Sequence, residues 1–272
     1  MRTILLTKIN HNKSASIKMK KIQDFKVKEY IWLNDDNYIL KLISDGDIPE
    51  IKPGNFAEIK VPNAEDVFLR RPISVLDVDY KNKEISFYIK AIGKGTKKLG
   101  SLNIGETVNI VYPLGNHFTI SGEKKVLIVG GGSGIAPFVT LGRELKKKNI
   151  ETVFLIGGRT SNDIFLTDEF SKYGKVEVTT EDGSRGEKGL VTQHTVFQKG
   201  FDFDKVYTCG PDPMMKAVAK IATSNGVECE ASLENMMACG IGACLCCVTP
   251  TKNGNKVVCT EGPVFNTKEL SW

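Results

Sequence analysis

The chain has 272 residues, of which 41% are hydrophobic and 25% charged; this composition is that of a folded protein of about two domains and excludes disorder for the whole chain. The formal net charge of +5 is concentrated at the start, where six Lys and Arg side chains precede the first acidic residue, Asp24. The remainder carries 31 basic and 32 acidic residues, so we expect no nucleic-acid partner. No apolar run approaches the roughly 18 to 20 residues that a membrane span needs, so we expect a soluble protein with no membrane partner.

Residues 1–18 form a basic leader that contains no acidic residue. The leader has neither a long apolar core nor a small-residue cleavage site, so it is not typical of a secretory signal. A loose likeness to a transit peptide remains as an alternative, but the simpler interpretation is a disordered extension. Met1 and Met19 both stay open as the natural start.

The cysteines are crowded rather than spread along the chain. Five of the seven fall within 21 residues, between Cys239 and Cys259. An odd number of cysteines, clustered in a chain long enough to build its own core, argues against a disulfide scaffold and favours a metal site in a reducing compartment. We therefore expect a cytoplasmic protein.

Short strands separated by turn residues are predicted between residues 19 and 121. Examples are residues 38–43, 57–61, 85–89 and 107–111, with Gly, Pro, Asn and Asp between them. Strands at this spacing predict a small antiparallel β-barrel.

The pattern changes between residues 122 and 226. An apolar strand at 126–129 leads through a glycine run into a helical stretch at 135–148, and further strands are predicted at 153–156, 176–179 and 205–208 before a helix that begins at Pro213. Alternation of strands and helices predicts an α/β domain with a parallel sheet. Residues 227–272 are too few to bury a core alone, so we expect a metal to hold them.

Four of the clustered cysteines have the spacing C-x4-C-x2-C-x11-C, which matches plant-type 2Fe-2S ferredoxins. Gly240, Gly242 and Ala243 keep bulk away from the loop, and the fourth thiol is expected on a hairpin that turns at 253–255. Zinc is the alternative, although zinc sites usually present two C-x2-C knuckles and only one occurs here. Cys246 is expected not to be a ligand. The predicted ligands are Cys239, Cys244, Cys247 and Cys259.

A flavin-type motif follows the strand-like residues 67–69. In Arg71-Pro72-Ile73-Ser74 the arginine can pair with a pyrophosphate and the serine can hydrogen-bond a flavin ring. A glycine loop at 93–96 then opens a helical stretch at 96–102, where backbone N–H groups favour an anion. An ordinary tight turn is the alternative for this loop.

A second glycine run lies between the strand at 126–129 and the helix that follows. It can hold a dinucleotide, but it departs from the standard fingerprint because its third glycine position is Pro137. Cys209 ends a later strand at the same edge of the sheet. Glu181 and Asp182 would repel the 2′-phosphate of NADP, whereas Ser184 and Arg185 could bind one; we favour NAD. The residues of the run are Gly130, Gly131, Gly132, Ser133 and Gly134.

Taken together, these motifs resemble the ferredoxin–NADP reductase superfamily, through RPIS at 71–74, GKGT at 93–96, GGGSGIAP at 130–137 and CGPDPM at 209–214. The cluster motif MACGIGACLCC at 237–247, with CTEGPVF downstream, is similar to that of the electron transfer subunits of B-type dihydroorotate dehydrogenases. The resemblance covers nearly everything after Met19.

The resemblance implies an α+β multidomain fold: an FAD-binding antiparallel barrel over 19–121, an NAD-binding α/β domain over 122–226 and a 2Fe-2S domain over 227–272. It implies that the four predicted cysteines bind iron, and that the glycine run and Cys209 face the nicotinamide nucleotide. The implied FAD contacts are Arg71, Pro72, Ile73, Ser74, Tyr88, Ile89, Lys90, Gly95 and Thr96.

The implied activity is that of an oxidoreductase subunit in pyrimidine biosynthesis. Electrons would leave FMN in a separate dihydroorotate-oxidising subunit and cross the cluster and FAD to NAD, in a heterotetramer of two copies of each chain. The sequence offers no catalytic residues for an organic substrate: its histidines are His11, His117 and His194, and no paired carboxylates appear. A subunit of another reductase complex, or a redox sensor, are the alternatives.

Overall fold

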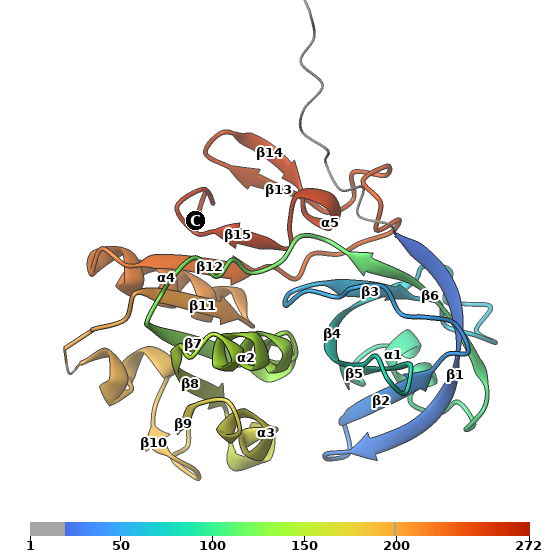
Figure 1. Ribbon diagram of the computed structural model, residues 1–272, viewed down its shortest axis with the longest axis horizontal. Helices are drawn as coiled ribbons and strands as arrows, with labels where there is room; N and C mark the ends of the chain where they lie inside the picture. The colour runs from blue at the N-terminus through green and yellow to red at the C-terminus, as the bar shows by residue number, and fades with distance from the viewer. Residues whose placement is uncertain (1–19, 199) are drawn as a thin grey trace, which may run out of the picture.

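A barrel and a layered sheet lie side by side, with a C-terminal segment across the end of both (Figure 1). The computed structural model describes residues 20–198 and 200–272. The expected leader lies outside the described residues. None of the described helices is long and apolar enough to cross a membrane.

The barrel is closed by six antiparallel strands in the order β1-β2-β5-β4-β3-β6. Its strands alternate between side chains that fill the barrel and side chains that face outward, as in β6, where Val108, Ile110 and Tyr112 are buried in the barrel core. The strands and the one helix are β1 (Lys21–Trp32), β2 (Asn37–Ile43), β3 (Phe56–Ile59), β4 (Arg71–Asp79), β5 (Glu84–Lys90), α1 (Lys94–Leu99) and β6 (Thr107–Leu114).

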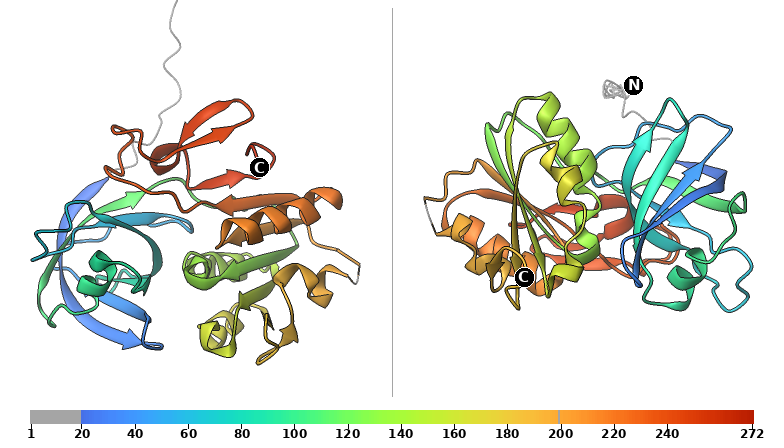
Figure 2. Two further views of the ribbon diagram at one scale, coloured as in Figure 1. Left: turned by 180° about the vertical axis from the view of Figure 1, so that it is seen from behind. Right: turned by 90° about the horizontal axis from the view of Figure 1, so that it is seen from below.

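The second body is a seven-stranded sheet in the order β10-β9-β8-β7-β11-β12-β15, parallel except for β15. Helices cover both of its faces, and α2 lies between the sheet and the barrel (Figures 1 and 2). Its elements are β7 (Lys125–Gly131), α2 (Phe138–Lys147), β8 (Glu151–Gly158), α3 (Thr167–Ser171), β9 (Lys175–Thr180), β10 (Glu187–Lys188), β11 (Lys205–Cys209), α4 (Asp212–Ser224), β12 (Glu228–Ser232) and β15 (Val264–Asn266).

Three helices begin at different residues from those expected, and α4 differs least, since it begins at Asp212 rather than Pro213. The helix expected at 135–148 begins at Phe138, because the glycine run first forms a 3-10 turn over Gly132–Ile135 and Pro137 then takes the N-cap position. The helix expected at 96–102 spans Lys94–Leu99, with Gly93 as its N-cap and Gly100 as its C-cap. The sequence pattern thus predicted the helices at 96–102 and 135–148, but the glycine and proline residues at their ends determine where they begin and end.

The C-terminal segment is interwoven with the α/β sheet. β12 pairs along its length with β11, and β15 pairs with β12 in the opposite direction, as in Glu230↔Asn266. The sheet therefore continues past residue 226. Between β12 and β15 lie the cysteine loop, the hairpin of β13 (Val248–Thr251) and β14 (Gly254–Val257), and the short helix α5 (Val258–Glu261). Cys259 was expected on the hairpin and instead lies in α5, directly after β14.

An apolar interface joins the barrel to the sheet. The outward side chains of Ile39, Leu76 and Tyr88 pack in one cluster with Ile135 and Phe138 of the α/β body. At the edge of this interface, Arg143 of α2 pairs with Asp77 of β4 at 2.7 and 2.8 Å. The two bodies thus meet through a buried surface and a paired charge rather than through the linker alone.

Candidate functional site

The two halves of the predicted flavin motif meet in the structure. Arg71 begins β4, and its Nη1 donates to the carbonyl oxygens of Leu69 and Arg70 at 3.1 and 3.2 Å. A Cβ atom on Gly95, in the first turn of α1, would lie 2.5 Å from Arg71 Nε. Only glycine lets the helix come this close to the guanidinium. The site therefore has an arginine set against a glycine loop, which is a donor set that fits the pyrophosphate of FAD.

The other predicted flavin residues differ in how they are used. Pro72, Ile73 and Ser74 lie half-buried on β4. The Thr96 hydroxyl donates to the Gly93 carbonyl oxygen at 3.1 Å and accepts from the Gly93 N–H, so it serves as a helix cap.

Residues 88–90 point in different directions. The Tyr88 hydroxyl donates to Asn37 Oδ1 at 2.9 Å, and its ring meets Phe165 of the α/β body edge-on with centroids 6.1 Å apart. Burial raises the pKa of Tyr88. Ile89 is buried in the barrel core, so only its backbone is open to a ligand, while the Lys90 side chain is exposed.

The predicted nucleotide loop lies at the carboxyl edge of the parallel sheet. β7 and β11 are neighbours with Gly130 opposite Cys209, and a Cβ atom on Gly134 would overlap the Cys209 carbonyl oxygen. The loop and the end of β11 therefore pack directly on each other, at the edge where open α/β sheets bind ligands. Cys209 is buried, and this burial raises the pKa of its thiol well above the ordinary value.

Backbone N–H groups point at the sulfurs of the cysteine loop. Gly242 N donates to Cys259 Sγ at 3.2 Å, and Cys259 N donates to Cys247 Sγ at 3.3 Å. The Ile241 N–H does the same for Cys239 and is the main reason that the pKa of this thiol falls to about 6. Burial raises the pKa of Cys259 to about 12. Such N–H donors favour the thiolates that a metal centre requires.

The four thiols lie in two pairs. Cys239 interacts with Cys244, and Cys247 with Cys259. Across residues 20–198 and 200–272, no three cysteine, histidine or acidic side chains converge on one point that could hold a single ion. A zinc site needs four ligands around one ion, whereas a 2Fe-2S cluster takes two thiolates on each iron. The arrangement of the thiols in two pairs therefore fits a 2Fe-2S cluster.

Sequence reasoning missed Glu58, a fully buried residue of β3. Neither of its carboxylate oxygens has a hydrogen-bond partner among the described residues. Burial raises the pKa of Glu58 to about 7, although the nearby Arg70 opposes this rise. The sequence feature that could have identified Glu58 is its place as the single acidic residue in the otherwise apolar strand Phe56–Ile59.

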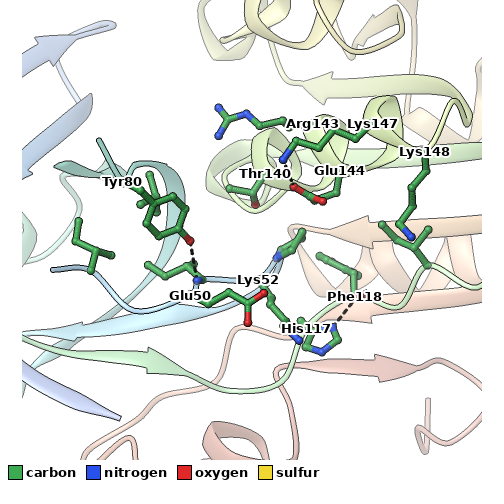
Figure 3. A pocket seen from close by; sticks show the side chains of 15 residues that line it. Glu50, Lys52, Tyr80, His117, Phe118, Thr140, Arg143, Glu144, Lys147 and Lys148 are labelled. Atoms are coloured by element: carbon green, nitrogen blue, oxygen red, sulfur yellow. Dashed lines mark hydrogen bonds and ion pairs between the residues drawn. The ribbon is translucent and has the colours of Figure 1, made fainter. Parts of the chain in front are cut away.

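A cavity of about 850 Å³ lies between the barrel and the later turns of α2 (Figure 3). Lys52 and Tyr80 line it from the barrel, and Arg143 and Lys147 line it from α2, while His117 lies between them on the linker. None of the predicted site residues lines this cavity. It is therefore distinct from the flavin, nucleotide and cysteine sites.

A flavin-type barrel, a nucleotide-binding sheet and a cysteine loop in one chain define an NAD-linked flavoprotein oxidoreductase of the ferredoxin-reductase type. Residues 128–220 match the oxidoreductase NAD-binding domain, and residues 234–271 match the iron-sulfur cluster binding domain of dihydroorotate dehydrogenase B. The cluster-binding match covers all four predicted iron ligands.

Curated relatives extend the comparison to most of the chain. The dihydroorotate dehydrogenase B (NAD(+)) electron transfer subunit of Clostridium perfringens is 38% identical over 249 residues, 91% of this chain and 97% of the relative. That of Fusobacterium nucleatum is 35% identical over 254 residues, 90% of this chain and 96% of the relative. The chain belongs to the family of dihydroorotate dehydrogenase B (NAD(+)) electron transfer subunits.

Solved structures agree on the fold. A chain of an NADH-dependent reduced ferredoxin-NADP oxidoreductase, studied for flavin-based electron bifurcation, superposes with a TM-score of 0.83 at 30% identity, covering 91% of this chain and 90% of that one. The cytochrome b5 reductase domain of Ulva prolifera nitrate reductase has a TM-score of 0.65 at 20% identity, covering 76% and 94%. The latter likeness concerns the fold alone.

Proposed function

We propose that this chain is an oxidoreductase subunit that passes electrons between a dihydroorotate-oxidising partner and NAD, in pyrimidine biosynthesis. Its cofactors are FAD, a 2Fe-2S cluster and NAD. FAD exchanges two electrons with a nicotinamide and single electrons with an iron-sulfur cluster, so it belongs between the other two. The protein binds these cofactors, holds them in sequence for electron transfer and adjusts their reduction potentials.

One observation supports this order of cofactors: strand β3 contacts both the flavin motif and the cysteine loop. β3 pairs with β4 so that Glu58 lies opposite Pro72 of the flavin motif. On the outer face of the same strand, Phe56 packs in one cluster with Cys247 and Cys259. The FAD and cluster sites are thus separated by little more than one layer of β-sheet.

We assign roles to the predicted residues on this basis. Arg71 binds the FAD pyrophosphate beside Gly95, and the backbone of residues 130–134 holds the diphosphate of NAD. Cys239 and Cys244 hold one iron, and Cys247 and Cys259 hold the other.

Three side chains near the end of β9 support NAD over NADP. Arg185 donates to Thr167 Oγ1 at 2.9 Å and to the Ile164 carbonyl oxygen at 3.4 Å, and the Ser184 hydroxyl donates to Asp182. The groups that could bind a 2′-phosphate are therefore already engaged, and Asp182 adds a repelling charge.

The partner docks at the cysteine loop. Met236, Ile241 and Leu245 surround the predicted ligands with exposed fractions of 86%, 52% and 61%. Exposed apolar side chains grouped around a redox centre are typical of a surface that a partner covers. We propose that the partner is an FMN-containing catalytic subunit and that the complex holds two copies of each chain.

We further propose domain limits of 19–121 for the FAD domain and of 122–226 for the main part of the NAD domain. The pairing of β12 and β15 with the sheet supports treating the cluster-binding part of 227–272 as an insertion between these two strands.

The test is reconstitution with the FMN-containing partner under anaerobic conditions. We expect the two chains to co-purify with FAD and iron, and dihydroorotate to yield NADH only when both are present. Co-purification without dihydroorotate-dependent NADH formation would refute the proposal.

A role in another redox complex is the second candidate, supported by the likeness to the ferredoxin-NADP oxidoreductase chain. NADH formation from reduced ferredoxin without the FMN partner would favour it.

A further inference from the structure

The direction of the Glu58 side chain follows from the alternation of β3. Ala57 and Ile59 point into the barrel core, and Phe56 points outward to the cluster-binding segment. Since successive side chains of a strand face opposite sides, Glu58 points outward with Phe56. The contact between Glu58 and Gly240 supports this direction: a Cβ atom on Gly240 would lie 2.7 Å from Glu58 Cγ and 3.3 Å from Glu58 Oε1.

Gly240 is the residue after Cys239, so Glu58 touches the turn that presents the first predicted ligand. Gly240 has φ of +66°, a conformation in which a side chain is disfavoured, and the space that the missing side chain leaves is occupied by Glu58 and Leu114. Glu58 is therefore the acidic group of the flavin domain that lies directly against the cluster-binding loop.

The Glu58 carboxyl group is buried, and the charges of Arg70 and Arg71 lie near enough to lower its pKa, but neither guanidinium donates a hydrogen bond to its oxygens. It has 0% exposure and no hydrogen-bond partner among the described residues. Arg70 approaches Glu58 through the backbone: its Nη1 donates to the Glu58 carbonyl oxygen at 3.3 Å and to the Asn109 carbonyl oxygen at 2.9 Å. Its Nη2 donates to Asn109 Oδ1 at 2.6 Å. A buried carboxylate without a partner is costly, so its presence calls for a function.

We propose that Glu58 is a positioning residue of the electron-transfer path, whose negative charge, set against the Cys239–Gly240 turn, lowers the reduction potential of the cluster. The inference rests on the proposed function, because it requires the cluster at the predicted ligands.

The direction of the effect on the reduction potential of the cluster follows from electrostatics. Reduction adds an electron to the cluster, and a neighbouring negative charge in a medium of low dielectric opposes that addition. The backbone of Glu58 pairs with Pro72 of the flavin motif, whereas its carboxyl group faces Gly240 of the cluster-binding loop, so its charge acts mainly on the cluster. A lower cluster potential favours passage of the electron onward to FAD.

The experiment is a redox titration of the purified, cluster-loaded chain at mildly alkaline pH, followed by electron paramagnetic resonance of the reduced cluster. Glu58→Gln removes the charge and keeps the shape. We expect its cluster potential to rise by an amount that changes the reduced-to-oxidised ratio roughly tenfold, about 59 mV for a one-electron couple. Glu58→Asp should stay close to the original potential, because it restores the charge.

The matched control is Asp24→Asn, which removes an exposed carboxylate that accepts from Asn109 Nδ2 on the same outer face of the barrel. Water screens this charge, so we expect little change in potential. Equal shifts in E58Q and D24N, or none in E58Q, would overturn the proposal. Loss of the cluster in E58Q but not in E58D would also overturn it, since the role would then be structural. A parent chain that binds no 2Fe-2S cluster would instead refute the proposed function.

Discussion

Two adjacent thiols of the cysteine loop have different environments. Cys247 is buried and accepts from the Cys259 N–H, whereas Cys246 is exposed and its closest polar partner is the Met236 carbonyl oxygen at 3.7 Å. We expect Cys247→Ser to abolish the visible absorbance of the cluster and Cys246→Ser to retain it. Iron content and absorbance after anaerobic purification measure both, and equal loss in the two variants would refute the ligand assignment.

Arg71 is the residue that we propose supplies a positive charge to the FAD pyrophosphate. Replacing it with Ala should weaken FAD binding by roughly 10- to 100-fold, because a charge-assisted hydrogen bond of about 1.5–3 kcal/mol is lost. Lys97→Ala is the control, since it removes an exposed positive charge from α1, the helix whose first turn contacts Arg71. Flavin content after gel filtration is the measurement. Unchanged flavin in R71A, or equal loss in K97A, would contradict the role of Arg71.

Local motifs were predictable from the sequence, but Glu58 was not. The cysteine spacing and the residues Arg71 to Ser74 act through neighbours in the chain, so a linear pattern is enough to detect them. The burial of Glu58 depends on Gly240, which lies in another part of the chain. A long-range contact of this kind leaves only a weak trace in the sequence, here one acid in an apolar strand.

At the scale of elements, the linker between β6 and β7 is fixed to the sheet by a buried network. Lys205 of β11 has 2% side-chain exposure and lies 3.0 Å from Glu230 and 2.9 Å from Glu228. Its Nζ also donates to the hydroxyl and carbonyl oxygens of Thr119 in the linker, and Thr119 N donates to Glu230 at 2.9 Å. This network holds the linker against β11 and β12.

Lys205→Met should destabilise the protein by about 3 kcal/mol, the lower end of the cost of removing one partner of a buried ion pair, because Thr119 still donates to Glu230. Urea unfolding measures the loss. Lys216→Met is the control, since Lys216 is an exposed lysine whose interactions are a long surface ion pair with Asp212, at 3.9 Å, and a contact with the Trp272 ring, 6.0 Å from its centroid. Similar losses in both variants would show that burial of Lys205 is unimportant.

The same network predicts a dependence on alkaline pH. Burial lowers the pKa of Lys205, but the carboxylates of Glu228 and Glu230 outweigh this effect, so the pKa is raised. A raised pKa means that the stabilisation is complete below the unfolded value of about 10.4 and is lost as the pH rises through the folded value. The difference in the free energy of unfolding between the parent and K205M should stay constant up to about pH 9 and shrink above about pH 10, as the Lys205 ammonium loses its proton. A constant difference would mean that charge is not its source.

The existence of most elements followed from the sequence, whereas the pairing of distant ones did not. The apolar strand expected at 126–129 is the centre of β7, because a run of buried aliphatic residues specifies a strand by itself. The joining of β15 to β12 depends on residues that come together only when the cysteine loop folds between them. For this reason the sequence did not reveal that β12 and β15 extend the sheet beyond residue 226.

For the whole molecule, the anchoring of the cluster-binding segment predicts a local response to iron removal. β12 and β15 are held by backbone pairing within the sheet, whereas we expect the loop between them to depend on the cluster for its order. We expect chelation of reduced iron to speed amide exchange over residues 234–247 several-fold and to leave β11 and β12 protected. Hydrogen-exchange mass spectrometry measures this. Cooperative unfolding of the barrel and the sheet on iron loss would contradict it.

The interweaving of β15 with the sheet also limits modularity. Cutting the chain after Ser232 would remove the predicted iron ligands, but it would also expose Phe56 and Leu114 on the barrel and leave β12 as an unpaired edge strand. Exposed apolar surface beside an unpaired edge invites self-association. The cluster-binding segment therefore cannot be deleted without further change. A related protein that had lost the iron-sulfur cluster during evolution would need polar substitutions on both surfaces to remain a soluble flavin reductase.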